Sequence, residues 1–190
     1  MKSNLSLRAI AAALTLSFAL PAAAIAQSGH GDGHGDGHGG GQAAMIGAPG
    51  KKADRTIDVV MQDNYYEPES IEVKPGETIR FRIRNAGDFV HEFNIGTAEM
   101  HEGHQGEMQM MVDHGVLMPD HIDHAAAKAM QASMGHGEHN DPNSALIEPG
   151  KTAEIVWTFP KHMEGPVEFA CNVPGHYGSG MVGEFESGHH

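Results

Sequence analysis

Short segments in which apolar and polar residues strictly alternate constrain the fold of this chain more than any other feature. The clearest is T-I-R-F-R-I-R at residues 78–84, in which Ile79, Phe81 and Ile83 alternate with arginines. Alternate residues of a β-strand lie on the same face, and a proline–glycine turn signal precedes this segment. The pattern therefore predicts a half-buried antiparallel strand.

The alternating pattern recurs in the second half of the chain. The segment K-P-G-E-T at residues 74–78 resembles E-P-G-K-T at residues 148–152, and an alternating segment follows each of them. With the segments near residues 57–61, 71–73, 90–95, 166–171 and 181–186, they predict about eight short strands separated by turns. This number and spacing predict an all-β domain over residues 55–190, a Greek-key β-sandwich or barrel.

Residues 97–144 form a long insertion between the two halves, longer than an ordinary connection between strands. An alanine-rich stretch capped by Asp120 and stopped by Gly135 predicts a helix there, so the insertion is partly helical. Methionine suits Cu(I) and histidine suits Cu(II), so we expect accessory copper binding, with a plain flexible insertion as the alternative. The residues concerned are Met100, Met108, Met110, Met111, Met118, Met130, Met134, His101, His104, His114, His121, His124, His136 and His139.

The first 26 residues carry the features of a secretory signal peptide. Lys2 and Arg8 precede an apolar run that is too short to span a bilayer, and an A-x-A cleavage site ends at Ala26. Export to the periplasm follows, without stable insertion in the membrane. Removing the two cations would take the net charge from -13 to -15. A chain with this much negative charge would be repelled by nucleic acid and would attract cations.

Residues 27–54 predict a disordered arm and linker. The tract S-G-H-G-D-G-H-G-D-G-H-G-G-G-Q at residues 28–42 is too polar and too rich in glycine to pack into a core. His30, His34 and His38 recur every four residues and are expected to capture copper weakly. A solvated tail without metal is the alternative.

The candidate metal ligands near the C-terminus form a C-x4-H-x4-M sequence. Cys171, His176 and Met181 offer a soft thiolate, an imidazole and a thioether, a set of ligands suited to copper. Cys171 is the only cysteine, so in an oxidising compartment it cannot form an internal disulfide. It is therefore either an inert core residue or bound to something.

A fourth ligand is predicted from the strand phase. In V-E-F-A-C and in H-E-F-N-I the apolar residues mark the inward face, which also carries Cys171 and His91. A histidine on an apolar face is usually a core residue with a hydrogen bond, but its coincidence with the C-x4-H-x4-M sequence favours a ligand. Zinc is the rival metal, although thioether is not a usual zinc ligand.

On these motifs the chain resembles the cupredoxins, the family of type 1 blue copper proteins, over residues 55–96 and 145–186. The resemblance implies a cupredoxin-like fold in which His91, Cys171 and His176 are equatorial copper ligands and Met181 is the axial ligand. It also implies electron transfer through the edge of His176 to a redox partner protein. One departure is Glu92, because many members have asparagine or serine directly after the first histidine ligand.

The function expected from these features is copper tolerance by a periplasmic copper-binding protein with electron-transfer capability. The exported signal and the methionine- and histidine-rich insertion resemble those of bacterial periplasmic copper-tolerance cupredoxins. A dedicated electron shuttle of a respiratory or photosynthetic chain is the alternative. We do not expect an enzyme, because four protein ligands leave no open position for a substrate.

Overall fold

A computed structural model of the chain describes residues 45–135 and 141–188. All the elements described lie within the unit Asp36–His190. The expected signal peptide at residues 1–26 and the arm up to residue 44, with His30, His34 and His38, lie outside the described residues. So do four further histidines, His136, His139, His189 and His190.

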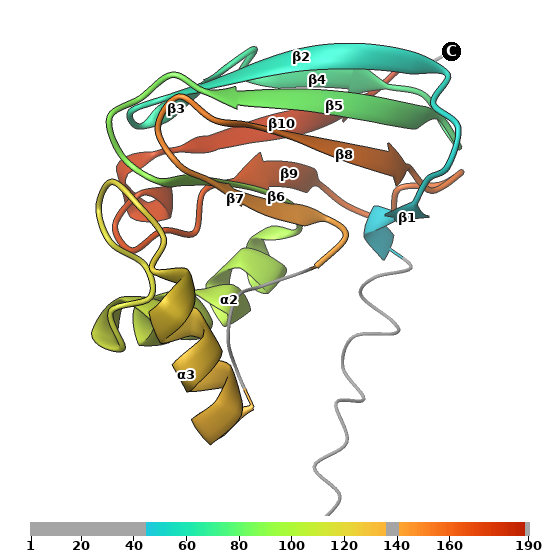
Figure 1. Cartoon of the computed structure of the whole chain (residues 1–190). Coiled ribbons are helices and arrows are strands. Elements are labelled where there is room, and N and C mark those ends of the chain that lie inside the picture. The colour runs from blue at the N-terminus through green and yellow to red at the C-terminus, as the bar shows by residue number, and fades with distance from the viewer. Residues whose placement is uncertain (1–44, 136–140, 189–190) are drawn as a thin grey trace, which may run out of the picture. The chain divides into compact units, whose positions relative to one another are not determined.

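Two five-stranded sheets make up the domain (Figure 1). The strand order is β1-β8-β5-β2-β3 in the first sheet and β4-β10-β9-β6-β7 in the second. The strands are β1 (Ala48–Pro49), β2 (Arg55–Gln62), β3 (Tyr65–Glu67), β4 (Ser70–Val73), β5 (Thr78–Asn85), β6 (His91–Gly96), β7 (Ser144–Ile147), β8 (Thr152–Thr158), β9 (Val167–Ala170) and β10 (Val182–Ser187). The all-β prediction is confirmed, with short β1, β3 and β7 as additional strands.

The pairing of the strands is mixed. β5 pairs antiparallel with β8, as its alternating sequence predicts, but it pairs parallel with β2 on its other side. β4 and β10 form the second parallel pair, and the remaining ladders are antiparallel. Sheets that mix parallel and antiparallel pairs in this way arise when the chain crosses from one sheet to the other between strands.

The main hydrophobic core lies between the two sheets. The side chains of Ile79, Phe81 and Ile83 are fully buried, whereas Arg82 on the outer face forms an ion pair with Asp58 at 2.7 Å. Aromatic rings continue the core across both sheets, with Phe81 and Phe93 centred 5.5 Å apart. Such offset and edge-on ring contacts add to the stabilisation from burial.

The insertion forms two helices, α2 (Ala98–Asp113) and α3 (His124–Met134). α3 begins later than predicted: Asp123, not Asp120, is its N-cap and accepts hydrogen bonds from the backbone N–H groups of Ala125 and Ala126. α2 was not expected from the sequence. Thr97 caps it by accepting a hydrogen bond from the N–H of Met100 at 3.3 Å.

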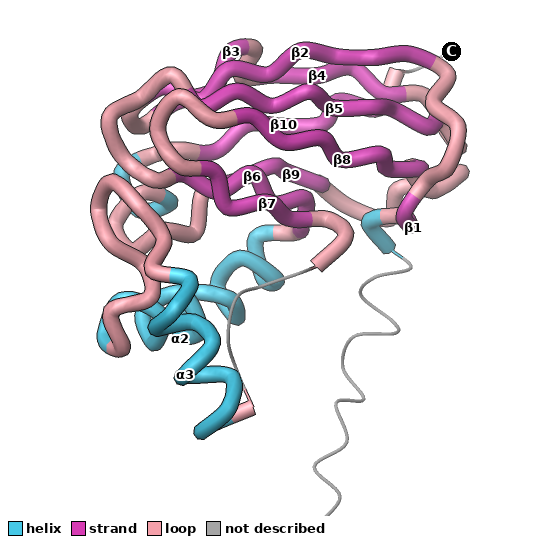
Figure 2. The backbone as a smooth tube through the Cα atoms, viewed as in Figure 1, coloured by secondary structure: helices cyan, strands magenta, loops and turns pink. Residues whose placement is uncertain are grey.

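The helices cover the outer side of the second sheet (Figures 1 and 2), where α2 contacts β6 and β9. A second hydrophobic core holds them, and three methionines of the insertion belong to it. Its buried members are Val90, Met108, Met111, Val116, Leu117, Ile122, Ala127 and Met130. These methionines therefore pack in a core, as methionine often does in irregular gaps.

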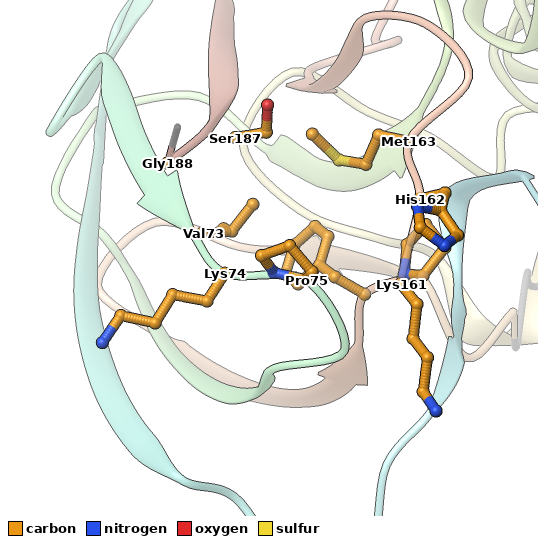
Figure 3. A pocket seen from close by; sticks show the side chains of 10 residues that line it. Val73, Lys74, Pro75, Lys161, His162, Met163, Ser187 and Gly188 are labelled. Atoms are coloured by element: carbon orange, nitrogen blue, oxygen red, sulfur yellow. The ribbon is translucent and has the colours of Figure 1, made fainter. Parts of the chain in front are cut away.

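A separate hollow lies at the far end of β10 from Met181 (Figure 3). Lys74, Lys161, His162 and Met163 line it, together with Ser187 at the end of β10. None of the predicted metal ligands borders this hollow. Among the described residues no helix is long and apolar enough to cross a membrane.

Candidate metal centre

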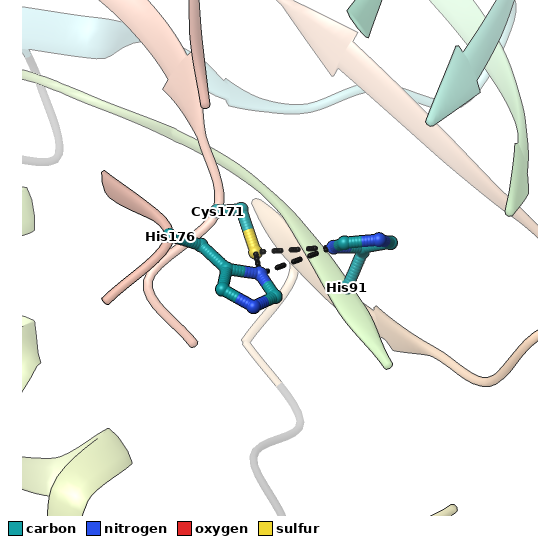
Figure 4. A group of neighbouring side chains, drawn as sticks. All are labelled: His91, Cys171 and His176. Atoms are coloured by element: carbon teal, nitrogen blue, oxygen red, sulfur yellow. Dashed lines mark hydrogen bonds between the residues drawn. The ribbon is translucent and has the colours of Figure 1, made fainter. Parts of the chain in front are cut away.

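Three of the four predicted ligands converge on one point (Figure 4). The Sγ of Cys171 lies 3.4 Å from Nδ1 of His176 and 3.9 Å from Nδ1 of His91, and the two Nδ1 atoms are 3.2 Å apart. No other group of three histidine, cysteine or acidic side chains in the described ranges is arranged to hold a metal ion.

The sheet brings two of these residues together from distant parts of the sequence. His91 is the first residue of β6, and Cys171 directly follows β9. The two strands are antiparallel, with Asn94 opposite Ala170, so the start of β6 and the end of β9 lie at the same end of the sheet. His176 comes from the loop before the short 3-10 helix η1 (Tyr177–Ser179).

Backbone hydrogen bonds hold Met181 beside Cys171 and His176. Its carbonyl accepts a hydrogen bond from the N–H of Cys171 at 3.1 Å, and its own N–H donates to the carbonyl of His176 at 3.0 Å. The Met181 side chain is fully buried in the core between the sheets. The loop from Cys171 to Met181 is thus closed on itself next to the three converging donor atoms.

Asp63 orients the His91 ring, which was not expected from the sequence. The Oδ1 of Asp63 lies 2.9 Å from Nε2 of His91, on the side of the ring opposite the converging atoms. Burial acts to raise the pKa of Asp63, but hydrogen bonds from His91 and the N–H of Asp88 lower it overall. The ionised carboxylate favours a proton on Nε2, which leaves the Nδ1 lone pair for a metal ion.

The Cys171 thiol is held in a dry environment. Its side chain has no exposed surface, and burial raises its pKa to about 12. The backbone N–H of Glu92 donates a hydrogen bond to Sγ at 3.3 Å. Without a metal the sulfur is therefore a protonated thiol, and metal binding must displace that proton.

His176 is the most accessible of the three converging residues. Burial, together with the nearby His91, lowers the pKa of His176, so the ring is neutral at physiological pH and can act as a ligand. A shallow apolar hollow borders the ring, lined also by Phe89, Leu117, Met118 and Pro174. Part of this hollow comes from the insertion, so α2 and the loop after it help to shape the surface around His176.

Glu92 is fully buried, although the alternation of β6 predicts that its side chain faces outwards. α2 covers this face of the sheet, and Glu92 accepts hydrogen bonds from Ser144, Asn172 and His104 there. Burial would raise its pKa, but these hydrogen bonds and the charge of His104 lower it. A buried carboxylate therefore stands directly after His91.

The donor atoms fit a small metal ion. Ligand bonds of about 2.0 Å to nitrogen and 2.3 Å to sulfur, at trigonal angles, place the donors about 3.4–3.8 Å apart. The observed separations of 3.2, 3.4 and 3.9 Å are close to these values. Two imidazoles and one thiolate in a trigonal set are the ligands of blue copper sites, whereas structural zinc takes four ligands.

Comparisons with known proteins agree with the fold and with the family predicted from the sequence. A family model described as a cupredoxin-like domain matches residues 10–103. A relative from Pseudomonas aeruginosa, named copper-resistant cuproprotein CopI, is 48% identical over 147 residues, which are 72% of this chain and 78% of the relative. The protein of the same name from Rubrivivax gelatinosus is 36% identical over 170 residues, 88% of each chain.

The fold is also similar to that of a solved structure. Auracyanin B covers 76% of this chain with 97% of its own length, at a TM-score of 0.53 and 16% sequence identity. That likeness concerns the fold alone, whereas the sequence relatives extend over most of the chain. The chain therefore belongs to the cupredoxin family, and the relatives reported above are copper-resistance cuproproteins.

Proposed function

We propose that this protein binds one copper ion through His91, Cys171, His176 and Met181 and acts in copper tolerance. The observation that carries the proposal is the convergence of the three donor atoms within 3.2–3.9 Å of one another. Met181 is assigned as the axial ligand because its buried side chain belongs to the same loop. The names of the relatives from Pseudomonas aeruginosa and Rubrivivax gelatinosus support the tolerance role.

The residues around the centre suit the transfer of one electron rather than catalysis on a substrate. A bound copper ion would supply a one-electron couple between Cu(I) and Cu(II). The Asp63 carboxylate fixes one imidazole, and the Glu92 N–H fixes the sulfur, so the ligands are held in place before metal binding. Four protein ligands leave no open position for a substrate.

We propose that electrons enter and leave at His176. This ring is only half-buried, whereas His91 and Cys171 are fully buried. The apolar hollow beside it can exclude water from a contact with a redox partner protein. A mostly apolar surface with a few polar groups is typical of sites at which a protein binds another molecule closely.

The tolerance role rests on more than the copper centre. The two-sheet domain without its insertion would be sufficient for an electron shuttle, yet the chain adds a histidine-rich arm and the insertion at residues 97–144. In the insertion Met118, Met134, His114 and His121 remain exposed and are our candidates for accessory copper binding. With the signal peptide at residues 1–26, these features point to copper capture in the periplasm.

Growth of cells that lack the gene tests the proposed role. We expect them to become sensitive to copper, and we expect wild-type protein to restore growth whereas Cys171→Ser does not. Asp58→Ala is the matched control, because Asp58 lies on the outer face of the other sheet. Normal growth in high copper together with a defect in respiration or photosynthesis would instead support a dedicated electron shuttle.

A further inference from the structure

Two buried polar residues stand directly after two of the proposed ligands. Glu92 follows His91 and Asn172 follows Cys171, and neither side chain has exposed surface. The two are joined to each other: the Glu92 carboxylate accepts hydrogen bonds from the Asn172 side chain at 2.8 Å and from its backbone N–H at 3.2 Å. They link the start of β6 to the loop after β9, on the side of these strands away from the converging donor atoms.

Three side chains from two successive turns of helix α2 contact this pair through hydrogen bonds. Nε2 of His104 lies 3.3 Å from the carboxylate of Glu92. The Gln105 side chain donates to the amide oxygen of Asn172 at 3.0 Å, and the Asn172 amide donates to Nδ1 of His101 at 3.2 Å. Side chains of the insertion thus form hydrogen bonds with the two residues that directly follow His91 and Cys171.

The contact between α2 and Glu92 joins opposite charges. Burial lowers the pKa of His104, but the carboxylates of Glu92 and Glu107 raise it overall to about 8. His101 beside it stays neutral, because burial lowers its pKa to about 4. A buried carboxylate is costly unless it is paired and hydrogen-bonded, and breaking such a pair by removing one partner is strongly destabilising.

The same Glu92 supplies the hydrogen bond to the sulfur. Its backbone N–H donates to Sγ of Cys171, so any movement of Glu92 alters that hydrogen bond. Hydrogen bonds and charges around a ligating thiolate tune the reduction potential of a copper site. In many family members a short neutral residue occupies this position, whereas the longer, charged Glu92 also reaches the helix.

We propose that Glu92 is a positioning residue that couples α2 to the copper centre, so that the His104–Glu92 contact sets the reduction potential through the sulfur ligand. This inference rests on the proposed copper function. It gives the insertion a role separate from accessory copper binding: a change in α2 is transmitted to Cys171 through one ion pair, between the partly buried His104 and the fully buried Glu92. Ser144, at the end of the insertion, belongs to the same network, because its hydroxyl donates a hydrogen bond to the Glu92 carboxylate at 2.5 Å.

A double-mutant cycle on protein loaded with one equivalent of copper tests the coupling. His104→Ala leaves the Glu92 anion uncompensated, which favours Cu(II). We expect a fall in potential that corresponds to at least a threefold change in the Cu(II)/Cu(I) equilibrium, about 28 mV. The same substitution in a Glu92→Gln background is expected to have no effect. His104→Lys, which keeps the cation, is expected to restore the potential.

The metal-free protein provides an independent readout, the rate at which Cys171 is alkylated. His104→Ala is expected to raise this rate at least threefold, because it loosens Glu92. As with the potential, no effect is expected in the Glu92→Gln background. Gln109→Ala is the control, because Gln109 is exposed on α2 and its side chain donates a hydrogen bond to Asp113 at 2.8 Å, away from Glu92. Equal effects of His104→Ala in both backgrounds, or an equal effect of Gln109→Ala, would overturn the coupling.

The two proposals fail in distinguishable ways. If the wild-type protein with copper shows no visible thiolate absorption, the assignment of the copper centre is wrong, and the alkylation cycle still decides whether α2 is coupled to Cys171. If the absorption is present but the cycle is additive, the copper centre stands and the coupling through Glu92 is rejected.

Discussion

At the scale of single residues, the centre depends on side chains that hold the ligands as much as on the ligands. His91 was predicted from the strand phase, but its partner Asp63 was not. Asp63 lies in the turn between β2 and β3, 28 positions before His91, and no local sequence pattern links the two. Only the parallel pairing of β2 with β5 brings that turn to the start of β6.

The Asp63–His91 contact leads to a prediction on metal affinity. Asp63→Ala should lower copper affinity by about 10–100-fold, because the His91 ring loses the group that fixes its orientation and tautomer. Competition titrations with a copper chelator measure this directly. Asp58→Ala, which removes an exposed carboxylate on the outer face, is the control and should leave the affinity unchanged. Equal affinities for Asp63→Ala and wild type would contradict the assigned role.

The ion pair of His104 predicts a pH dependence of stability. Its pKa is about 8 in the folded protein against an ordinary value of 6.5, so the pair stabilises the fold fully below pH 6.5 and this contribution is lost as the pH rises through 8. For a partly exposed ring the loss is on the order of 1 kcal/mol. The titratable groups that act on the pKa of His104 include Glu92, Glu107 and His101.

Denaturant unfolding of the metal-free protein between pH 6 and pH 8.5 measures this dependence. The difference in unfolding free energy between wild type and His104→Ala should shrink over that range. Comparing the two proteins removes the contributions of the other titrating groups that both share. A difference that stays constant with pH would mean that His104 is not charged in the folded protein.

At the scale of the elements, β10 and β9 fit together through a glycine. Gly183 lies opposite Phe169, whose ring covers it, and a Cβ at this position would meet that ring and come within 2.7 Å of the Glu69 carbonyl. Gly183→Ala should therefore destabilise the fold by about 1–3 kcal/mol in denaturant unfolding. Gly106→Ala in α2 has open space and should be neutral or stabilising; equal stability of both variants would contradict this packing.

The helices show where reasoning from the sequence reached its limit. Alternation identified the main strands because burial on one face of a sheet imposes a period of two. α2 was missed because it contains Gly103 and Gly106 and carries methionine and histidine in place of leucine. The burial of Glu92 was missed for the same reason, because the alternation of β6 gives no sign that a helix covers the outer face of this strand.

The methionines of the insertion divide into two groups with different expected effects. Met108 and Met111 are buried in the second core, so Met111→Leu should keep the fold and leave the number of bound coppers unchanged. Met118 and Met134 are about two-fifths exposed and remain available to a metal ion. Replacing both of these with leucine should lower the copper stoichiometry; an unchanged stoichiometry in metal analysis would remove them as accessory ligands.

At the scale of the whole molecule, one sheet end collects the proposed ligands while an inserted pair of helices covers the sheet beside them. The two-sheet fold and the family were predicted from the sequence and are confirmed. The ligand set was predicted as well, and the structure places three of its donor atoms together. The role of these residues as copper ligands remains our proposal.

An absorption titration of the protein with Cu(II) tests that proposal most directly. We predict intense visible absorption from thiolate-to-copper charge transfer that saturates at one equivalent and is absent in Cys171→Ser. Any further copper taken up by the insertion or the arm should bind without adding to this absorption. A wild-type complex that binds copper but stays colourless would contradict the central claim.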